Sequence, residues 1–190
     1  INSTTSEHYL RLIKKNSKIP IILFPGTNTK ISNGADGFLL LSLISGRNPN
    51  FLIGKHVEQA FKLKESSLEI IPTGYILVGN EKNTAVSYIS NTSPIPSEQH
   101  DIGAATAIAG ELLGFQLIYL DAGSGSTNSV SENMILNVSK NIDCPIIVGG
   151  GLNTIEKIEL ALENGADVVV VGNAVEKNQK ILNQIGKIKK

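Results

Sequence analysis

The sequence predicts a parallel α/β fold of the (β/α)₈-barrel, or TIM-barrel, type. Short apolar runs alternate with helix-like segments along most of the 190 residues, and each run ends in a polar or glycine-rich loop. This alternation is typical of parallel sheets. No GxGxxG follows the first apolar run, which argues against a dinucleotide-binding sheet. We therefore expect one barrel domain over residues 1–190, with its functional site at the carboxyl ends of the strands.

The expected elements follow from apolar spacing and turn residues. Strands are expected at 19–24, 37–44, 68–78 (interrupted at 72–74), 116–120, 146–148 and 168–171. Helices are expected at 7–15, about 51–64, 102–113, 132–140 and 153–165, and a last one from Ala174. The stretch 79–101 is rich in Asn, Ser, Thr and Pro, so we interpret it as an irregular binding loop or lid.

A closed barrel needs eight strands, two more than these elements provide. The chain begins with Ile1 rather than methionine. We therefore expect the first two βα units to lie upstream of it, so that the domain is incomplete at its N-terminal side.

The composition indicates a neutral globular protein. Hydrophobic residues make up 41%, and 17 Lys and Arg balance 17 Asp and Glu. Zero net charge argues against broad binding of nucleic acid. The single cysteine, Cys144, allows no intrachain disulfide, so we expect a reducing compartment and a cytoplasmic location. No apolar stretch reaches the roughly 18–20 residues of a transmembrane helix.

Two glycine loops follow consecutive predicted strands near the C-terminus. Gly149, Gly150 and Gly151 end the run at 146–148, and Gly172 with Asn173 ends the run at 168–171. Glycine lets backbone N–H groups approach an oxyanion, and a following helix N-terminus adds partial positive charge. Barrels commonly bind phosphate in their last two strand-end loops. We interpret the pair as a phosphate site; the alternative is that both are only tight turns.

Asp121 is a carboxylate that directly ends a predicted strand. It could act as a base or accept a hydrogen bond from a hydroxyl, or it could organise its own loop through the N–H groups of Gly123 or Ser124. The three histidines do not cluster, and HExxH, CxxC and GxSxG are absent. The sequence thus offers no zinc site and no serine triad. A phosphate pocket, one carboxylate and many hydroxyl groups suit a small phosphorylated polyol.

Several segments, in order and over nearly the whole chain, resemble geranylgeranylglyceryl phosphate synthase, the family that includes the bacterial heptaprenylglyceryl phosphate synthases. They are FPGTNTKIS (24–32), LLLSLISGRNPNFLIGKHVE (39–58), EIIPTGYILV (69–78), YISNTSPIP (88–96), YLDAGSGS (119–126), IIVGGGL (146–152) and VVVVGNAVE (168–176). A generic phosphate-binding barrel would share only the two glycine loops.

The resemblance implies a modified TIM barrel that transfers a prenyl group from a polyprenyl diphosphate to the terminal hydroxyl of sn-glycerol 1-phosphate. An ether bond forms and diphosphate leaves, with Mg²⁺ as cofactor; the enzyme is expected to be a homo-oligomer. Asp121 would be the catalytic residue. The glycerol phosphate would be held by Tyr119, Leu120, Asp121, Ala122, Gly123, Ser124, Gly125, Gly150, Gly151, Gly172 and Asn173.

The sequence departs from the family pattern at two places. Asp121 stands where the family usually has glutamate. The family's magnesium-binding Asp-Pro and its Gly-Gly-Ser/Thr motif have no counterpart, and only Ser3 or Thr4 offers a remnant for metal binding. Two alternatives therefore remain. One is a sugar-phosphate barrel enzyme, which usually needs a strand-end lysine or carboxylate pair; the other is a non-catalytic barrel that binds glycerophosphate or prenyl groups.

Overall fold

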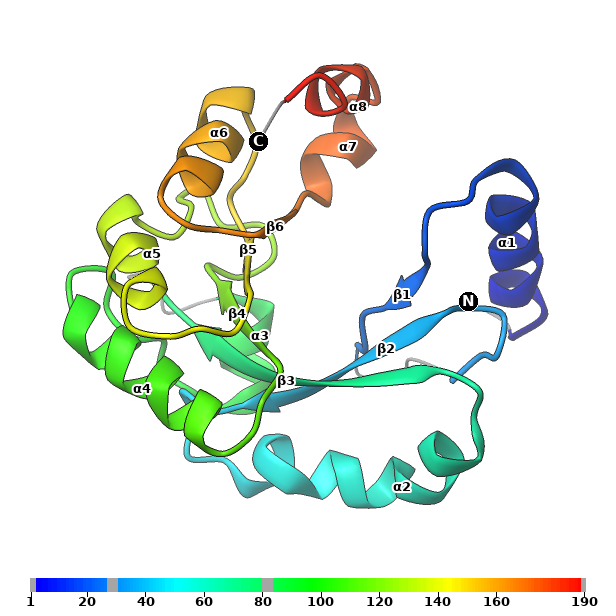
Figure 1. The fold of residues 1–190 in the computed structure, drawn as a ribbon, viewed down its shortest axis with the longest axis horizontal. Coiled ribbons are helices and arrows are strands. Elements are labelled where there is room, and N and C mark those ends of the chain that lie inside the picture. Colours follow the sequence, from blue (N-terminus) through cyan, green and yellow to red (C-terminus); the bar gives the residue numbers. More distant parts are fainter. Residues whose placement is uncertain (1–2, 27–30, 80–83, 189–190) are drawn as a thin grey trace.

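The computed structural model describes residues 3–26, 31–79 and 84–188, with side chains from Glu7 onward. Within these residues the strands form one six-stranded sheet in chain order, and every neighbouring pair is parallel. The sheet is strongly curled, and Figure 1 shows its two edges facing each other across an opening. The strands are β1 (Ile22–Leu23), β2 (Gly37–Leu43), β3 (Glu69–Leu77), β4 (Leu117–Asp121), β5 (Ile146–Gly149) and β6 (Val168–Val170).

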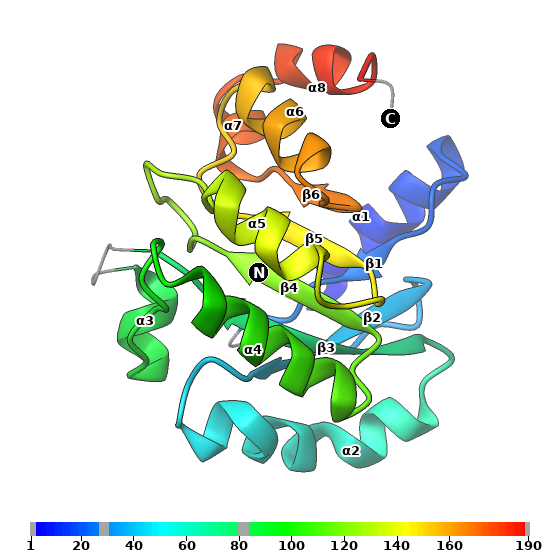
Figure 2. The same ribbon diagram turned by 60° about the vertical axis from the view of Figure 1, so that its left-hand side comes forward.

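Helices cover the convex side of this sheet, as Figures 1 and 2 show for α2, α4, α5 and α6. None of the helices among the described residues has the length and apolar character that crossing a membrane requires. The helical segments are α1 (Ser3–Asn16), η1 (Asn50–Gly54), α2 (Lys55–Glu65), α3 (Ala85–Ser90), α4 (His100–Leu112), α5 (Glu132–Ser139), α6 (Ile155–Glu163), α7 (Asn173–Lys177) and α8 (Lys180–Ile185).

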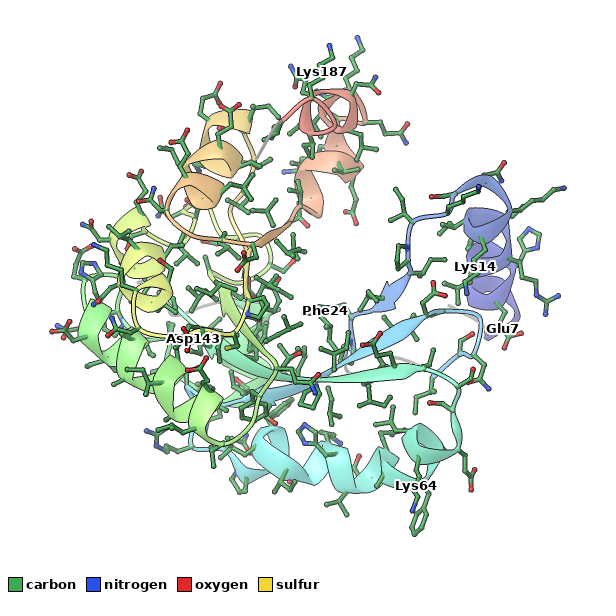
Figure 3. All side chains as sticks on the ribbon, in the orientation of Figure 1. Glu7, Lys14, Phe24, Lys64, Asp143 and Lys187 are labelled. Carbon is green, nitrogen blue, oxygen red and sulfur yellow. The ribbon has the colours of Figure 1, made fainter. Side chains whose placement is uncertain are left out.

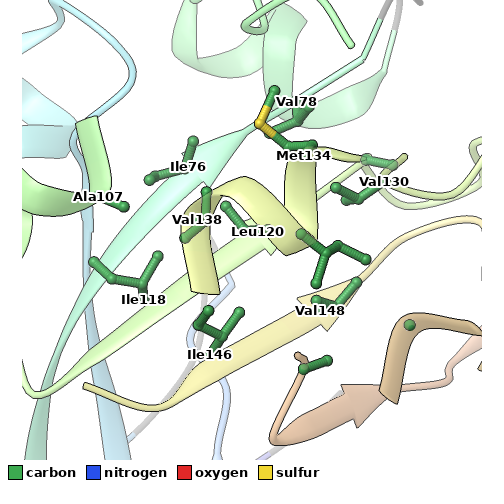
Figure 4. Close-up of a cluster of buried hydrophobic side chains, with 14 of the residues drawn as sticks. Ile76, Val78, Ala107, Ile118, Leu120, Val130, Met134, Val138, Ile146 and Val148 are labelled. Atoms are coloured by element: carbon green, nitrogen blue, oxygen red, sulfur yellow. The ribbon is translucent and has the colours of Figure 1, made fainter. Parts of the chain in front are cut away.

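Side-chain alternation along the strands separates a helix-side core from a concave face. On β4, Ile118 and Leu120 are fully buried against the helices, together with Met134 of α5 and Val148 of β5 (Figure 4). The intervening Tyr119 belongs to a second cluster on the concave face, with members from four strands. These are Leu39, Leu43, Tyr75, Leu77, Tyr119 and Ile147. The concave face is therefore the side on which strand-end residues can meet a ligand.

The parallel barrel-type fold and its six strands are confirmed, but the predicted interruption at 72–74 is wrong. β3 runs without a break through Pro72. The carbonyl of Pro72 accepts a hydrogen bond from the Gln116 N–H (2.8 Å), so the backbone edge of Pro72 faces β4. The β3–β4 pairing begins only at Thr73 and Leu117. The missing N–H of Pro72 therefore removes no ladder bond there.

The described part of the stretch 79–101, residues 79 and 84–101, is more regular than expected. It contains α3, which begins where the Thr84 hydroxyl accepts a hydrogen bond from the Ser87 N–H and ends at Asn91 with a left-handed backbone (φ 49°). Ile95 then forms a parallel bridge with Val78 at the end of β3. Local capping by threonine and asparagine thus orders this segment despite its polar composition. The predicted last helix is likewise two helices, α7 and α8.

Candidate active site

The loops after β4, β5 and β6 meet at one edge of the sheet because these strands are adjacent and parallel. The Ala122 N–H donates a hydrogen bond to the Gly149 carbonyl (3.0 Å). A Cβ placed on Gly150 would lie only 2.7 Å from Asp121 Oδ1, so the first two loops are in close contact. A Cβ on Gly125 would lie 3.9 Å from the side-chain nitrogen of Asn173, which places the third loop beside the first.

The rim of this loop cluster is accessible, whereas its base is packed. Ser124, Gly125, Gly172 and Asn173 are exposed, and Gly150 and Gly151 are partly buried. The side chains of Leu120 and Ala122 lie instead in the helix-side core, so only their backbone could contribute to a ligand site. The structure thus brings together the predicted substrate residues of all three loops.

Asp121 is buried at the base of the cluster, with 6% of its surface exposed. Its Oδ1 accepts a hydrogen bond from the Gly123 N–H (2.9 Å), and its Oδ2 accepts one from the Tyr75 hydroxyl. The hypothesis that Asp121 organises its loop is confirmed at Gly123. Burial raises the pKa of this carboxyl above its usual value, while the two hydrogen bonds act in the opposite direction. A raised pKa suits a carboxylate that accepts a proton near neutral pH.

Three aromatic rings line the concave face beside Asp121. The Tyr119 ring packs edge to face with Tyr75 (centroids 5.2 Å apart) and with Phe24 (5.6 Å). Phe24 follows β1 and projects into the curve of the sheet (Figure 3). Tyr75 and Phe24 were not among the predicted site residues. The contact of Tyr75 with Asp121 depends on the register between β3 and β4, which the sequence of β3 alone does not show.

Lys157 is a further residue that the sequence analysis did not identify. It lies on α6, and its Nζ donates to the carbonyl of Thr127 (3.1 Å) after β4 and to that of Gly151 (3.4 Å) after β5. One cation therefore links two of the three loops. Arg47, which follows β2, is exposed and donates to the carbonyl of Gly46 (2.9 Å) in its own loop.

The described residues include no ready-made cluster of metal ligands. They contain no group of three or more His, Cys, Asp or Glu side chains that could hold a metal ion. Ser3 and Thr4 begin α1, and their side chains lie outside the described part of the chain, as do Thr27 and Asn28 after β1.

The fold and the loop cluster define a parallel barrel-type protein with glycine loops suited to an anion at the carboxyl ends of its last strands. The PcrB family model matches residues 1–189. The chain belongs to the PcrB family.

Relatives and solved structures agree with this assignment. Geranylgeranylglyceryl phosphate synthase of Spirosoma linguale is 53% identical over 176 residues, which cover 93% of this chain and 71% of the relative. The Pyrococcus furiosus protein of the same name is 41% identical over 90% of this chain and 68% of its own length. The Thermoplasma acidophilum synthase, solved in complex with sn-glycerol-1-phosphate, superposes with a TM-score of 0.89 at 31% identity, covering 96% of this chain and 73% of its own.

Proposed function

We propose that this protein is a prenyltransferase that joins sn-glycerol 1-phosphate to a polyprenyl diphosphate, such as geranylgeranyl diphosphate, through an ether bond, in ether lipid biosynthesis. The observation that carries the proposal is the convergence of three strand-end loops beside a buried carboxylate, in a chain of the PcrB family. The complex of the Thermoplasma acidophilum relative with sn-glycerol-1-phosphate supports this choice of acceptor.

In this proposal the phosphate of the acceptor binds to the glycine loops. Backbone at Gly125, Gly150 and Gly172 can approach a phosphate oxygen without hindrance from a side chain. Asn173, beside Gly125, adds a side-chain amide at the same rim. The glycerol part then extends inward from the rim toward Asp121 and Tyr119.

Asp121 acts as the general base. The terminal hydroxyl of the glycerol loses its proton to the carboxylate, and the oxygen lone pair forms a bond to the allylic carbon of the donor. The bond from that carbon to the diphosphate oxygen breaks, and the diphosphate leaves with the electron pair. The raised pKa of Asp121 assists the proton transfer because it makes the carboxylate a stronger base.

The apolar donor chain is proposed to contact the concave face. Alternation along the edge strands turns Ile22, Val168 and Val170 toward this face, and each is more than one third exposed, as is Phe24 (46%). Exposed apolar side chains of this kind lose contact with water when a hydrocarbon chain covers them, which favours binding.

We also propose that two further βα units close the barrel between β1 and β6, upstream of Ile1. The exposed apolar residues on both edge strands support this closure, since a neighbouring strand would cover part of them. The intact mass of the protein purified from its own cells checks the proposal. A mass equal to the 20.3 kDa of this chain would contradict it.

Three properties are proposed on the family resemblance: dependence on Mg²⁺, assembly into a homo-oligomer, and a cytoplasmic location. The described residues supply no ligand set for the metal, so no step is assigned to it. Diphosphate release measured with Mg²⁺ and with EDTA tests the first property. Light scattering of the purified protein tests the second, and cell fractionation tests the third.

Diphosphate release tests the proposed function itself. The purified full-length protein is supplied with sn-glycerol 1-phosphate, Mg²⁺ and prenyl diphosphates of several lengths. We expect release with the 1-phosphate and none with sn-glycerol 3-phosphate. Binding of the 1-phosphate without release from any donor would overturn the transferase and favour a non-catalytic binding barrel.

Replacing Lys157 with methionine is expected to weaken binding of sn-glycerol 1-phosphate by roughly fivefold, the factor that corresponds to a net hydrogen-bond contribution near 1 kcal/mol. The reason is that Lys157 holds the carbonyls of Thr127 and Gly151 and so fixes two loops relative to each other. Calorimetric titration measures the affinity. Lys140→Met, at the exposed end of α5, is the matched control and is expected to bind normally. Equal affinity of the two variants would contradict the prediction.

A further inference from the structure

Tyr75 is a buried residue of β3 whose position is fixed by strand pairing and by ring packing. It pairs in register with Tyr119 of β4, and the two rings pack edge to face at an interplanar angle of 83°. Only 6% of Tyr75 is exposed. With the ring held in this way, the hydroxyl reaches diagonally across the strand pair and donates a hydrogen bond to Asp121 Oδ2.

Asp121 receives one donor on each oxygen and keeps capacity for another. Gly123 supplies the backbone N–H on Oδ1, and Tyr75 supplies the hydroxyl on Oδ2. An ionised carboxylate offers about four acceptor positions, so two donors leave room for a substrate hydroxyl. The two existing donors also determine the direction in which the remaining lone pairs point.

The titratable groups facing Asp121 are Tyr75 from β3 and Tyr119 from β4; the β5 side presents the glycines at 149 and 150. Burial and the nearby carboxylate raise the pKa of both tyrosines, so both keep their protons at neutral pH. Burial raises the pKa of Asp121, and the Tyr75 hydrogen bond lowers it. Among the described residues, no lysine, arginine or histidine contributes to this shift.

We propose that Tyr75 is a positioning residue for the base: its hydroxyl orients the Asp121 carboxylate and keeps it ionised, so that the acceptor of the glycerol proton is in place before the donor arrives. This inference rests on the proposed function, in which Asp121 takes that proton. Tyr75 keeps its own proton throughout. The proton of the substrate hydroxyl ends on Asp121, and the electron pair it leaves forms the new carbon–oxygen bond.

The test is Tyr75→Phe, which removes the hydroxyl and preserves the ring packing. Without this donor the pKa of Asp121 rises, because a hydrogen bond that favours the charged form is lost. The ionised base is then depleted at low pH, so we expect the acid limb of kcat/KM to move up by about one pH unit, with about tenfold lower activity on that limb. The deficit shrinks as pH increases. Tyr9→Phe, on the exposed side of α1, is the matched control and leaves the profile unchanged.

A purely structural role for Tyr75 would lower the melting temperature and leave the acid limb in place, which would overturn the inference. A second measurement does not depend on activity. Carbon-13 NMR titration of the aspartate carboxyls, with Asp121 assigned by its absence in Asp121→Asn, follows its pKa in the wild type and in Tyr75→Phe. An unchanged pKa overturns the inference even in an active enzyme. If the pKa of Asp121 is higher in Tyr75→Phe than in the wild type, but the wild-type protein releases no diphosphate, the pairing of Tyr75 with Asp121 is upheld and the proposed function is refuted.

Discussion

Asp121→Asn is expected to lower kcat for diphosphate release by roughly 10²- to 10⁴-fold, the usual contribution of a general base. Asparagine has nearly the same shape, and its oxygen can still accept from the Gly123 N–H while its nitrogen donates to the Tyr75 oxygen. The loop therefore keeps its hydrogen bonds, and only the proton acceptor is lost. Binding of sn-glycerol 1-phosphate, measured by calorimetry, is expected to persist.

A comparison of three variants distinguishes between two roles of Asp121: a general base, or a residue that only organises its loop. Asp143→Asn changes an exposed aspartate (Figure 3) and is expected to retain full activity. If Asp121 only organised its loop, Asp121→Asn would be mildly affected and Asp121→Ala severely affected. If Asp121 is the base, both substitutions are severe. Near-normal turnover of Asp121→Asn, alongside an inactive Asp121→Ala, would refute the proton-transfer role.

Much of this fold is encoded locally and could be predicted from the sequence. The parallel α/β class follows from alternating apolar runs and helical segments, and all six predicted strands agree with the structure in place, although 19–24 is shortened to β1. The error at 72–74 arose because proline is disfavoured inside a sheet. Whether Pro72 interrupts β3 depends on where β4 begins, and this register is not visible in the sequence of β3 alone.

The residues of the candidate site likewise divide into those that the local sequence indicates and those that depend on long-range contacts. Gly149 to Gly151 and Asp121 could be identified because each follows directly on an apolar run. Tyr75 and Lys157 act through contacts with residues 46 positions away, at Asp121, and 30 positions away, at Thr127. Such contacts depend on strand register and helix orientation. Both residues were therefore found only once the three-dimensional arrangement was known.

Gly151→Ala is expected to lower both the stability of the fold and the affinity for sn-glycerol 1-phosphate. Gly151 has a left-handed backbone (φ 67°), which costs an alanine about 1–2 kcal/mol. A Cβ at this position would also overlap the backbone carbonyl of Asn128 and lie 2.7 Å from the Ser129 nitrogen. Backbone cannot rotate away as a side chain can, so one of the two loops must shift. We expect binding to weaken by about tenfold or more, which corresponds to about 1.4 kcal/mol.

Two glycine controls separate the causes of this effect. Gly114 also has a positive φ (90°), but a Cβ there meets nothing within 4 Å, so Gly114→Ala measures backbone strain alone. Gly186 has an ordinary φ of −63° and ordinary contact distances, so Gly186→Ala should be nearly neutral. Urea denaturation and calorimetric titration give stability and affinity for all three variants. We expect Gly151→Ala to lose more stability than Gly114→Ala, and it alone should lose affinity for the ligand. If Gly151→Ala bound the ligand as tightly as Gly114→Ala does, the loop after β5 would not hold the phosphate, and the acceptor site would have to lie elsewhere on the sheet edge.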